Sequence, residues 1–106
     1  MRFSPAAPGK TTLEMLDAAH EGNLDLLFAA GGNFTEVMPD PDRVTESLRR
    51  VRTRVHMDIA LSSQMLVEPG EVVVLLPAAT RYEIEGGITE TSTERRVIFS
   101  PEIPGP

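Results

Sequence analysis

Three short strand-like runs alternate with stretches of helical spacing, and this alternation restricts the fold more than any other feature. The runs lie at Leu24–Ala30, Arg54–Ile59 and Val72–Leu76, and the last is continuously apolar. The first is nearly all apolar, which is typical of a strand that is covered on both faces. Parallel strands are joined by helical crossovers, so strands that alternate with helices predict a parallel sheet.

The helical stretches carry their own start and stop signals. Thr11 and Glu14 have the spacing of a capping box, and Gly22 is placed to end a helix over 11–20. Asp40 and Pro41 predict the N-cap and the first residue of a second helix, whose apolar residues recur every third or fourth position. Only a short helical turn fits over 61–67, before the Glu-Pro-Gly turn that precedes the third strand.

These elements predict an α/β fold, a small three-layer domain with a mostly parallel, Rossmann-like sheet of three to four strands flanked by helices. Arg96–Phe99 is the candidate fourth strand. We expect a flexible lead-in over 1–10, a single α/β domain over 11–100 and a Pro-rich tail over 101–106, because proline cannot join a sheet interior.

Composition excludes several classes of protein. The 106 residues suffice for one domain, and the net charge of −6 argues against nucleic acid, whose phosphates need a basic face. The chain has no cysteine, which excludes a disulfide framework and a thiolate nucleophile. We expect no membrane partner and a cytoplasmic location, because the sequence has neither a long apolar run nor the apolar core of a signal peptide.

Arginines crowd one stretch of this acidic chain. They are Arg43, Arg49, Arg50, Arg52 and Arg54. The cluster can form an anion-binding patch, or it can be a solvated helix end where the helix dipole favours cations. The second interpretation is favoured.

Candidate ligand contacts follow each predicted strand. In an open parallel sheet, ligands bind outside the carboxyl ends of the strands, which here are the segments 31–33, 56–58 and 77–80. Gly31 and Gly32 allow close approach of a ligand or a positive φ, and Asn33 offers an amide donor and acceptor. A simple turn explains the same three residues equally well. The full dinucleotide fingerprint is absent.

Asp58 ends the second strand, where a carboxylate can accept hydrogen bonds from a ribose or from a guanine edge. Capping of the following turn is an equally good interpretation of Asp58. His20 and His56 are the only histidines, and a single strand histidine is more often a packed or surface residue than a metal ligand. We therefore expect no metal site.

The carboxylates of the last third are the remaining catalytic candidates. Glu83, Glu85, Glu90 and Glu94 lie in a Gly-centred segment, and a solvated acidic loop is the favoured interpretation because no positioned partner is evident. Ser62 and Ser63 lack the setting of a nucleophilic serine and suit a helix N-cap.

Four segments together resemble a known family. AAGGNF, VHMDI, VVVLLPAATRYEIEGG and TSTERRV are similar to consecutive landmarks in the large subunit of molybdopterin oxidoreductases, the dimethyl sulfoxide reductase superfamily, and most closely its formate-dehydrogenase-like members. The resemblance runs from about Thr11 to the C-terminus. The family's large subunit is several times longer, and this chain resembles its third region, an α/β domain that grips one molybdopterin guanine dinucleotide.

The resemblance implies roles for individual residues. Asn33, in the turn with Gly31 and Gly32, would contact the cofactor, and Asp58 would bind its guanosine part. The segment with Pro77 and Thr80 would lie against the cofactor and a neighbouring domain. Departures from the family pattern weaken the contacts expected at three other positions, namely Met57, Ile84 and Ser92.

The resemblance also sets the expected function and partners. The chain would bind the guanine dinucleotide part of the cofactor within a larger oxidoreductase, whose molybdenum or tungsten is held elsewhere in the parent chain. The isolated chain would be catalytically inactive. Its partners would be the remaining domains of the parent enzyme. The alternatives are a protein-interaction module with an exposed apolar patch, and a small enzyme using Glu83, Glu85 and Asp58.

Overall fold

The computed structural model describes residues 8–105, so most of the predicted lead-in over 1–10 lies outside the described residues. The elements are α1 (Thr12–His20), β1 (Leu26–Ala30), α2 (Phe34–Val37), α3 (Pro41–Arg50), β2 (Thr53–Asp58), the 3₁₀ helix η1 (Ser63–Leu66), β3 (Val72–Pro77), β4 (Ile88–Thr91) and β5 (Val97–Ser100). Their order confirms the predicted one, and among them α2 and β4 have no counterpart in the sequence prediction.

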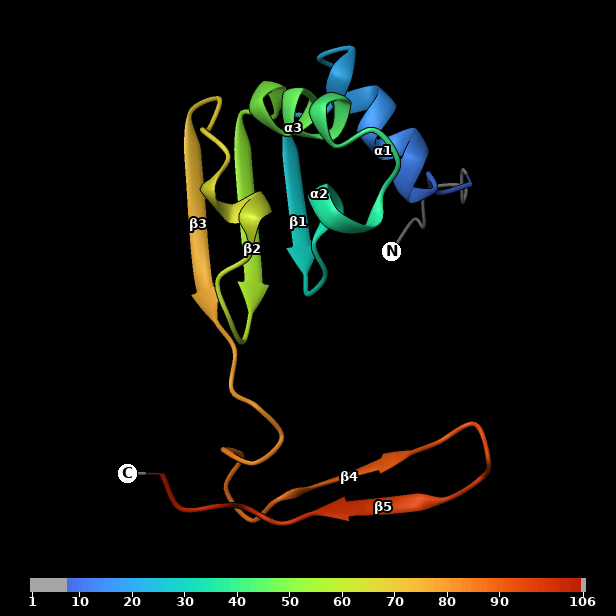
Figure 1. Cartoon of the computed structure of the whole chain (residues 1–106), viewed down its shortest axis with the longest axis vertical. Coiled ribbons are helices and arrows are strands. Elements are labelled where there is room, and N and C mark those ends of the chain that lie inside the picture. The colour runs from blue at the N-terminus through green and yellow to red at the C-terminus, as the bar shows by residue number, and fades with distance from the viewer. Residues whose placement is uncertain (1–7, 106) are drawn as a thin grey trace, which may run out of the picture.

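The first three strands form a parallel sheet in the order β1-β2-β3 (Figure 1). Leu26 pairs with Thr53 and Thr53 pairs with Val72, so the three strands begin level with one another. Their carboxyl ends therefore reach the same edge. The predicted α/β class with a small Rossmann-like parallel sheet is confirmed.

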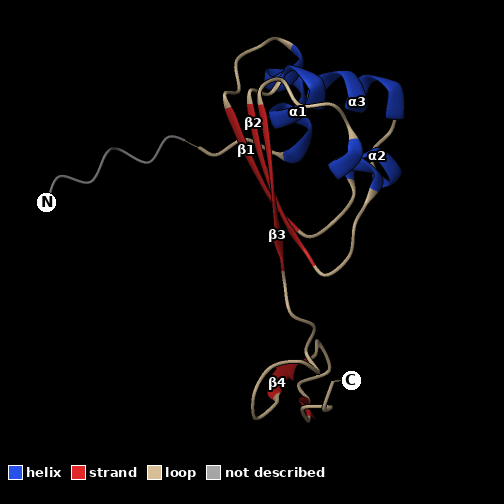
Figure 2. Cartoon of the chain, turned by 90° about the vertical axis from the view of Figure 1, so that its left-hand side faces the viewer, coloured by secondary structure: helices blue, strands red, loops and turns tan. Residues whose placement is uncertain are grey.

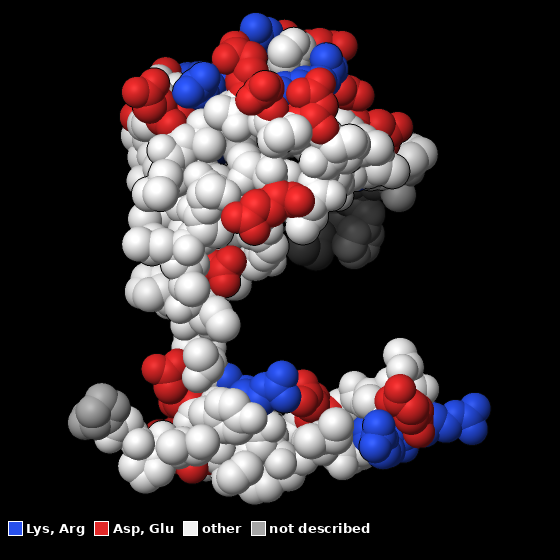
Figure 3. Space-filling model, viewed as in Figure 1, with Lys and Arg blue, Asp and Glu red and all other residues white. Residues whose placement is uncertain are grey.

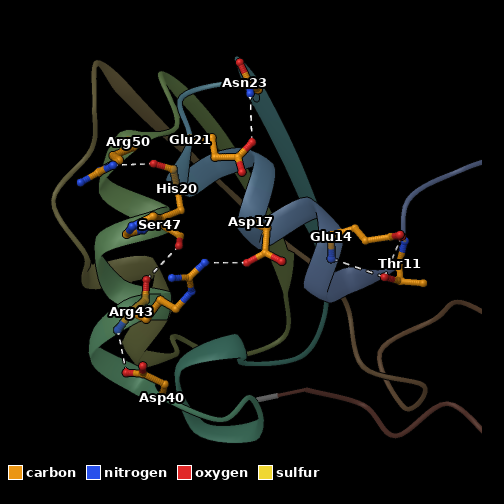
Figure 4. A network of polar contacts seen from close by, with 10 residues as sticks. All are labelled: Thr11, Glu14, Asp17, His20, Glu21, Asn23, Asp40, Arg43, Ser47 and Arg50. Atoms are coloured by element: carbon orange, nitrogen blue, oxygen red, sulfur yellow. Dashed lines mark hydrogen bonds and ion pairs between the residues drawn. The ribbon is translucent and has the colours of Figure 1, made fainter.

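Helices α1 and α3 begin where the sequence predicts. Thr11 and Glu14 form the reciprocal capping box, in which the Thr11 amide donates to the Glu14 carboxylate at 2.7 Å. Asp40 caps α3 by accepting from the Arg43 amide at 3.1 Å, with Pro41 as the first helical residue. Figure 4 shows how Arg43 of α3 then reaches Asp17 of α1, at 2.7 Å, and ties the two helices together.

The core lies between these helices and one face of the sheet. Leu48 and Val51 are fully buried and pack with Leu16 and Ala19 of α1 and with Leu27 of β1. Because Leu27 and Ala29 are the buried residues of β1, the covered face of the sheet is the one toward α1 and α3.

The opposite face of the sheet is not covered by residues 8–105, and Figure 2 shows the helices gathered on a single side. The sequence prediction of a strand covered on both faces is therefore wrong for β1 within residues 8–105, and those residues supply no third layer. The large apolar side chains left exposed define an apolar sheet face: Leu26, Phe28, Met57, Val72, Val74 and Leu76. Sheets of parallel strands normally bury both faces, so this surface is suited to further protein.

Strand β2 turns its polar residues inward. Arg54 and His56 are buried on the helix side, whereas Met57 is exposed and belongs to the apolar sheet face. Successive strand residues point to opposite faces, so the two sets cannot exchange places without a shift of register.

The predicted fourth strand exists, but it does not join the parallel sheet. β5 pairs antiparallel with β4, in a segment that the sequence analysis interpreted as a loop. Figures 1 and 2 show this hairpin beyond the carboxyl end of β3, at the end of an extended connection. The radius of gyration is accordingly 17.3 Å, against about 13 Å for a compact domain of this length.

No helix within residues 8–105 is long and apolar enough to cross a membrane.

Candidate functional site

Five of the six predicted contact residues meet at the carboxyl edge of the parallel sheet. The Gly31 amide donates to the Met57 carbonyl at 2.8 Å, which places the turn after β1 beside the end of β2. Asp58 is level with Pro77 in the register, and its carbonyl accepts the Ala78 amide at 2.9 Å. The sixth residue, Thr80, lies in the connection to the hairpin.

The glycine turn owes its residue type to backbone conformation. Gly31 and Gly32 have φ of 71° and 77°, a region that residues with a Cβ rarely adopt. A Cβ on either glycine would meet nothing within 4 Å, so sterics with neighbouring residues do not require glycine here. The open space in front of both positions leaves the backbone accessible to a ligand.

Asn33 is already engaged by protein groups. Its Nδ2 donates to the Ser63 hydroxyl at 2.8 Å, and its Oδ1 accepts from the Thr35 hydroxyl at 2.7 Å. One N–H and one lone pair of the amide remain for a ligand. Asn33 therefore both ties the turn to η1 and retains the capacity for one further contact of each kind.

Gln64 is a residue of this edge that the sequence analysis missed. It is 1% exposed, and its amide spans the glycine turn by donating to the Gly32 carbonyl at 2.7 Å and accepting from the Phe34 amide at 2.9 Å. A glutamine in a short helical stretch gives no sequence signal for this role, because the contact joins residues about thirty positions apart.

Arg54 holds the segment that contains Gln64, in the crossover between β2 and β3. The interpretation of the arginine cluster as solvated is wrong for this residue. Arg54 is fully buried and donates to the carbonyls of Gln64, at 3.1 Å, and Glu68, at 3.2 Å, and also to that of Val67. Burial lowers the pKa of its guanidinium, but arginine stays charged in proteins. The charged guanidinium therefore holds the crossover between β2 and β3 in place.

The other arginines of the cluster are exposed, as predicted. Arg43, Arg50 and Arg52 form surface ion pairs with Asp17, Glu46 and Glu71, each within 2.9 Å. Figure 3 shows charged side chains of both signs gathered over the end of the body that carries α1 and α3, away from the carboxyl edge of the sheet. The cluster is therefore not positioned as an anion site for a ligand at that edge.

A small hollow opens beside the end of β2. It has a volume of about 150 Å³ and is lined by His56, Asp58, Ile59, Ala60, Leu61, Met65, Leu75, Leu76 and Pro77. Asp58 provides its only carboxylate, and Oδ1 of that group accepts the Ile59 amide at 2.7 Å. This bond joins Asp58 to the next residue and does not cap η1, whose N-cap is Ser62, and the Asp58 side chain lines the hollow.

The acidic segment is exposed to solvent, as predicted, but part of it is strand β4 and not a loop. Glu83 accepts the Thr80 amide at 2.7 Å, and this backbone hydrogen bond lowers the pKa of the Glu83 carboxyl. Glu90 lies on β4 and pairs with Arg81. Neither glutamate lines the hollow with Asp58, so a catalytic pair of carboxylates is not formed there. Within residues 8–105, no group of three or more His, Asp and Glu side chains is placed to hold a metal ion.

Comparison with known proteins adds one relative. No family model matches the chain. The chain is 33% identical, over 102 residues, to a protein of Bacillus subtilis (strain 168) named probable oxidoreductase YjgC. The match covers 92% of this chain and 10% of that protein, so the chain spans about a tenth of the length of its curated relative. This chain is therefore related in sequence to part of a protein named as a probable oxidoreductase.

Proposed function

We propose that this chain is the part of a formate-dehydrogenase-like molybdopterin oxidoreductase that holds the guanine dinucleotide end of the cofactor. The observation that carries the proposal is the convergence of the Gly31–Asn33 turn, Asp58 and Pro77 at one edge of a parallel sheet. Dinucleotides bind at this edge in open α/β sheets. The similarity to a named oxidoreductase supports the enzyme class.

The residues present fit a guanine base better than they fit a phosphate. Asp58 offers a carboxylate, which accepts hydrogen bonds from the N1–H and N2–H₂ groups of guanine. The walls of the hollow next to it are apolar side chains, which suit the flat face of a base. The exposed arginines lie elsewhere, so phosphate groups would contact the Gly32 and Asn33 amides, since the Gly31 amide is bonded to Met57.

This fit gives the cofactor and the residues of this chain different roles. The metal held by the pterin part of the cofactor supplies the two-electron chemistry of the parent enzyme. Asp58 orients the base, Asn33 and the glycine turn contact the adjoining sugar and phosphates, and Gln64 and Arg54 keep that turn in place. The role of this chain is binding and orientation, and we expect the purified chain alone to oxidise no formate.

The proposal also assigns partners. The apolar sheet face carries six large exposed apolar residues and no charged one, and the related protein is about ten times longer than this chain. We propose that the remaining domains of a parent oxidoreductase cover this face. A protein-interaction module without nucleotide affinity is the second candidate function, and the same surface favours it.

Changing Asp58 to asparagine should weaken binding of GDP, used as the probe for the guanine end, by at least about tenfold. Asparagine keeps the size and one acceptor oxygen, so the Ile59 hydrogen bond survives, but it replaces the second oxygen with a donor that opposes the guanine N–H groups. Isothermal titration with GDP and ADP measures both affinity and preference.

The matched control is Asp42→Asn, an exposed change on α3 that should leave GDP binding unaltered. The unchanged chain should prefer GDP to ADP, because adenine lacks the paired donors that a carboxylate accepts. Equal binding of GDP by the Asp58 variant would contradict the assignment of Asp58 to the base.

A further inference from the structure

His56 is a buried polar side chain without a partner. It is 1% exposed, and neither ring nitrogen has a hydrogen-bond partner within residues 8–105. Buried polar groups are nearly always hydrogen-bonded, and each exception calls for an explanation such as a missing water or ligand. His56 lines the hollow at the end of β2, and both ring nitrogens are themselves buried, so a partner reaches them only when side chains around the ring shift.

The imidazole is neutral near pH 7. Burial, and secondarily the charge of Arg54, lower its pKa below the usual histidine value. A neutral imidazole carries one N–H donor and one acceptor nitrogen. Once its ring is reached, His56 therefore adds one donor to the acceptor oxygens of Asp58 at the hollow.

The spacing of the two side chains suits a planar group with polar edges. His56 and Asp58 are two residues apart on one strand, so they share a face and their Cα atoms are roughly 6.6 Å apart. Leu61, Met65 and Leu75 supply apolar walls around them. At about 150 Å³ the hollow is smaller than the roughly 300–1,000 Å³ that encloses a whole small-molecule ligand, and it suits a single base.

We propose that His56 is a second base-reading residue, whose ring N–H donates to N7 of the guanine that Asp58 holds by N1–H and N2–H₂. This assignment rests on the proposed function and deepens it, because it makes the hollow the base subsite. Guanine is the natural base with paired donors on one edge and the N7 and O6 acceptors on the other. The two side chains would together read both edges.

Changes in the ligand test the contact between His56 and N7 without disturbing the fold. GDP and 7-deaza-GDP differ by the exchange of N7 for a C–H group, which removes the acceptor and keeps the shape and the Asp58 contacts. The unchanged chain should bind 7-deaza-GDP about three- to tenfold more weakly than GDP, the effect of one buried hydrogen bond. Inosine diphosphate, which lacks N2–H₂, should also bind more weakly, through Asp58.

A direct spectroscopic readout accompanies the affinities. In a chain labelled with ¹⁵N in its histidine rings, GDP should shift the protonated ring nitrogen of His56, whereas 7-deaza-GDP should leave it in place. A His56→Phe variant should bind both ligands with equal, weaker affinity.

The outcomes separate the two proposals. If GDP binds, inosine diphosphate binds more weakly and 7-deaza-GDP binds as tightly as GDP with no ring shift, the His56 assignment is overturned while the guanine site stands. A partner that is only water gives this same result. If no guanine nucleotide binds saturably, the proposed function fails, and the His56 assignment fails with it.

Discussion

Replacing Arg54 with alanine is expected to lower the free energy of unfolding by roughly 3 kcal/mol. The change removes a fully buried side chain together with its hydrogen bonds to the carbonyls of Gln64, Val67 and Glu68. Removal of the buried charge offsets part of the loss, but the void and the unpaired Gln64 carbonyl outweigh it. Urea denaturation followed by circular dichroism gives the value.

Two further variants test whether the loss of stability comes from the missing volume, from the missing hydrogen bonds or from the loss of any arginine in the cluster. Arg54→Met keeps most of the volume without the donors, so it should be more stable than the alanine variant and less stable than the unchanged chain. Arg52→Ala removes a neighbouring arginine of the same cluster that is exposed and paired with Glu71 on the surface, and it should change stability little. Equal stability of the Arg52 and Arg54 alanine variants would contradict the structural role of Arg54.

Replacing Gly70 with alanine is expected to cost roughly 2 kcal/mol, the typical effect of overpacking. An added Cβ would lie 2.7 Å from the Val51 carbonyl oxygen and 3.2 Å from that of Arg49, and both are backbone atoms that cannot rotate away. The strain falls at the entry of β3, where the Glu71 and Val72 amides both donate to the Arg52 carbonyl at 3.0 Å.

Gly9→Ala is the control for this prediction, because a Cβ there would meet nothing within 4 Å. Thermal unfolding of the two variants should show a clear loss for Gly70→Ala and almost none for Gly9→Ala. A Gly70 variant as stable as the unchanged chain would mean that the turn before β3 lies farther from the end of α3 than the structure places it.

The local signals in the sequence explain why the elements and their order could be predicted. Capping residues such as Thr11 and Asp40 act within one helical turn, so their partners Glu14 and Arg43 lie only three positions away. The level start of the three parallel strands then brings their carboxyl ends together. The positions of Gly31, Asp58 and Pro77 at one edge follow from strand order alone.

What the sequence could not predict depends on distant partners. Alternation along β2 shows which residues share a face, but not which face the helices cover, so Arg54 was interpreted as solvated and His56 only as a packed or surface residue. Gln64 and Arg54 act across turns that bring together residues ten to thirty positions apart. Strand β4 (Ile-Thr-Glu-Thr) is mostly polar and resembles a loop in its composition, whereas the apolar residues of β5 indicated a strand but not its antiparallel partner.

The apolar sheet face is exposed because β2 places its polar residues on the side of the sheet that the helices cover. Met57 is exposed because its neighbours His56 and Asp58 point toward the helices, and Phe28 on β1 is 52% exposed beside it. A surface of this kind is costly in water, so its exposure fits a chain that is covered by other parts of a larger protein. Coverage of this face and binding at the carboxyl edge meet at Leu76, which belongs to the face and also lines the hollow.

The central claim is that the carboxyl edge of the sheet binds the guanine end of a dinucleotide cofactor, and a titration of the ¹⁵N-labelled chain with GDP tests it most directly. Backbone amide signals of Gly31, Gly32, Asn33, Asp58 and Ala78 should shift together and saturate, while those of α1 and of the β4–β5 hairpin stay in place. The Thr80 amide, which is bonded to Glu83, should move little. An absence of shifts up to millimolar GDP, or shifts confined to the apolar sheet face, would contradict the claim and favour the interaction module.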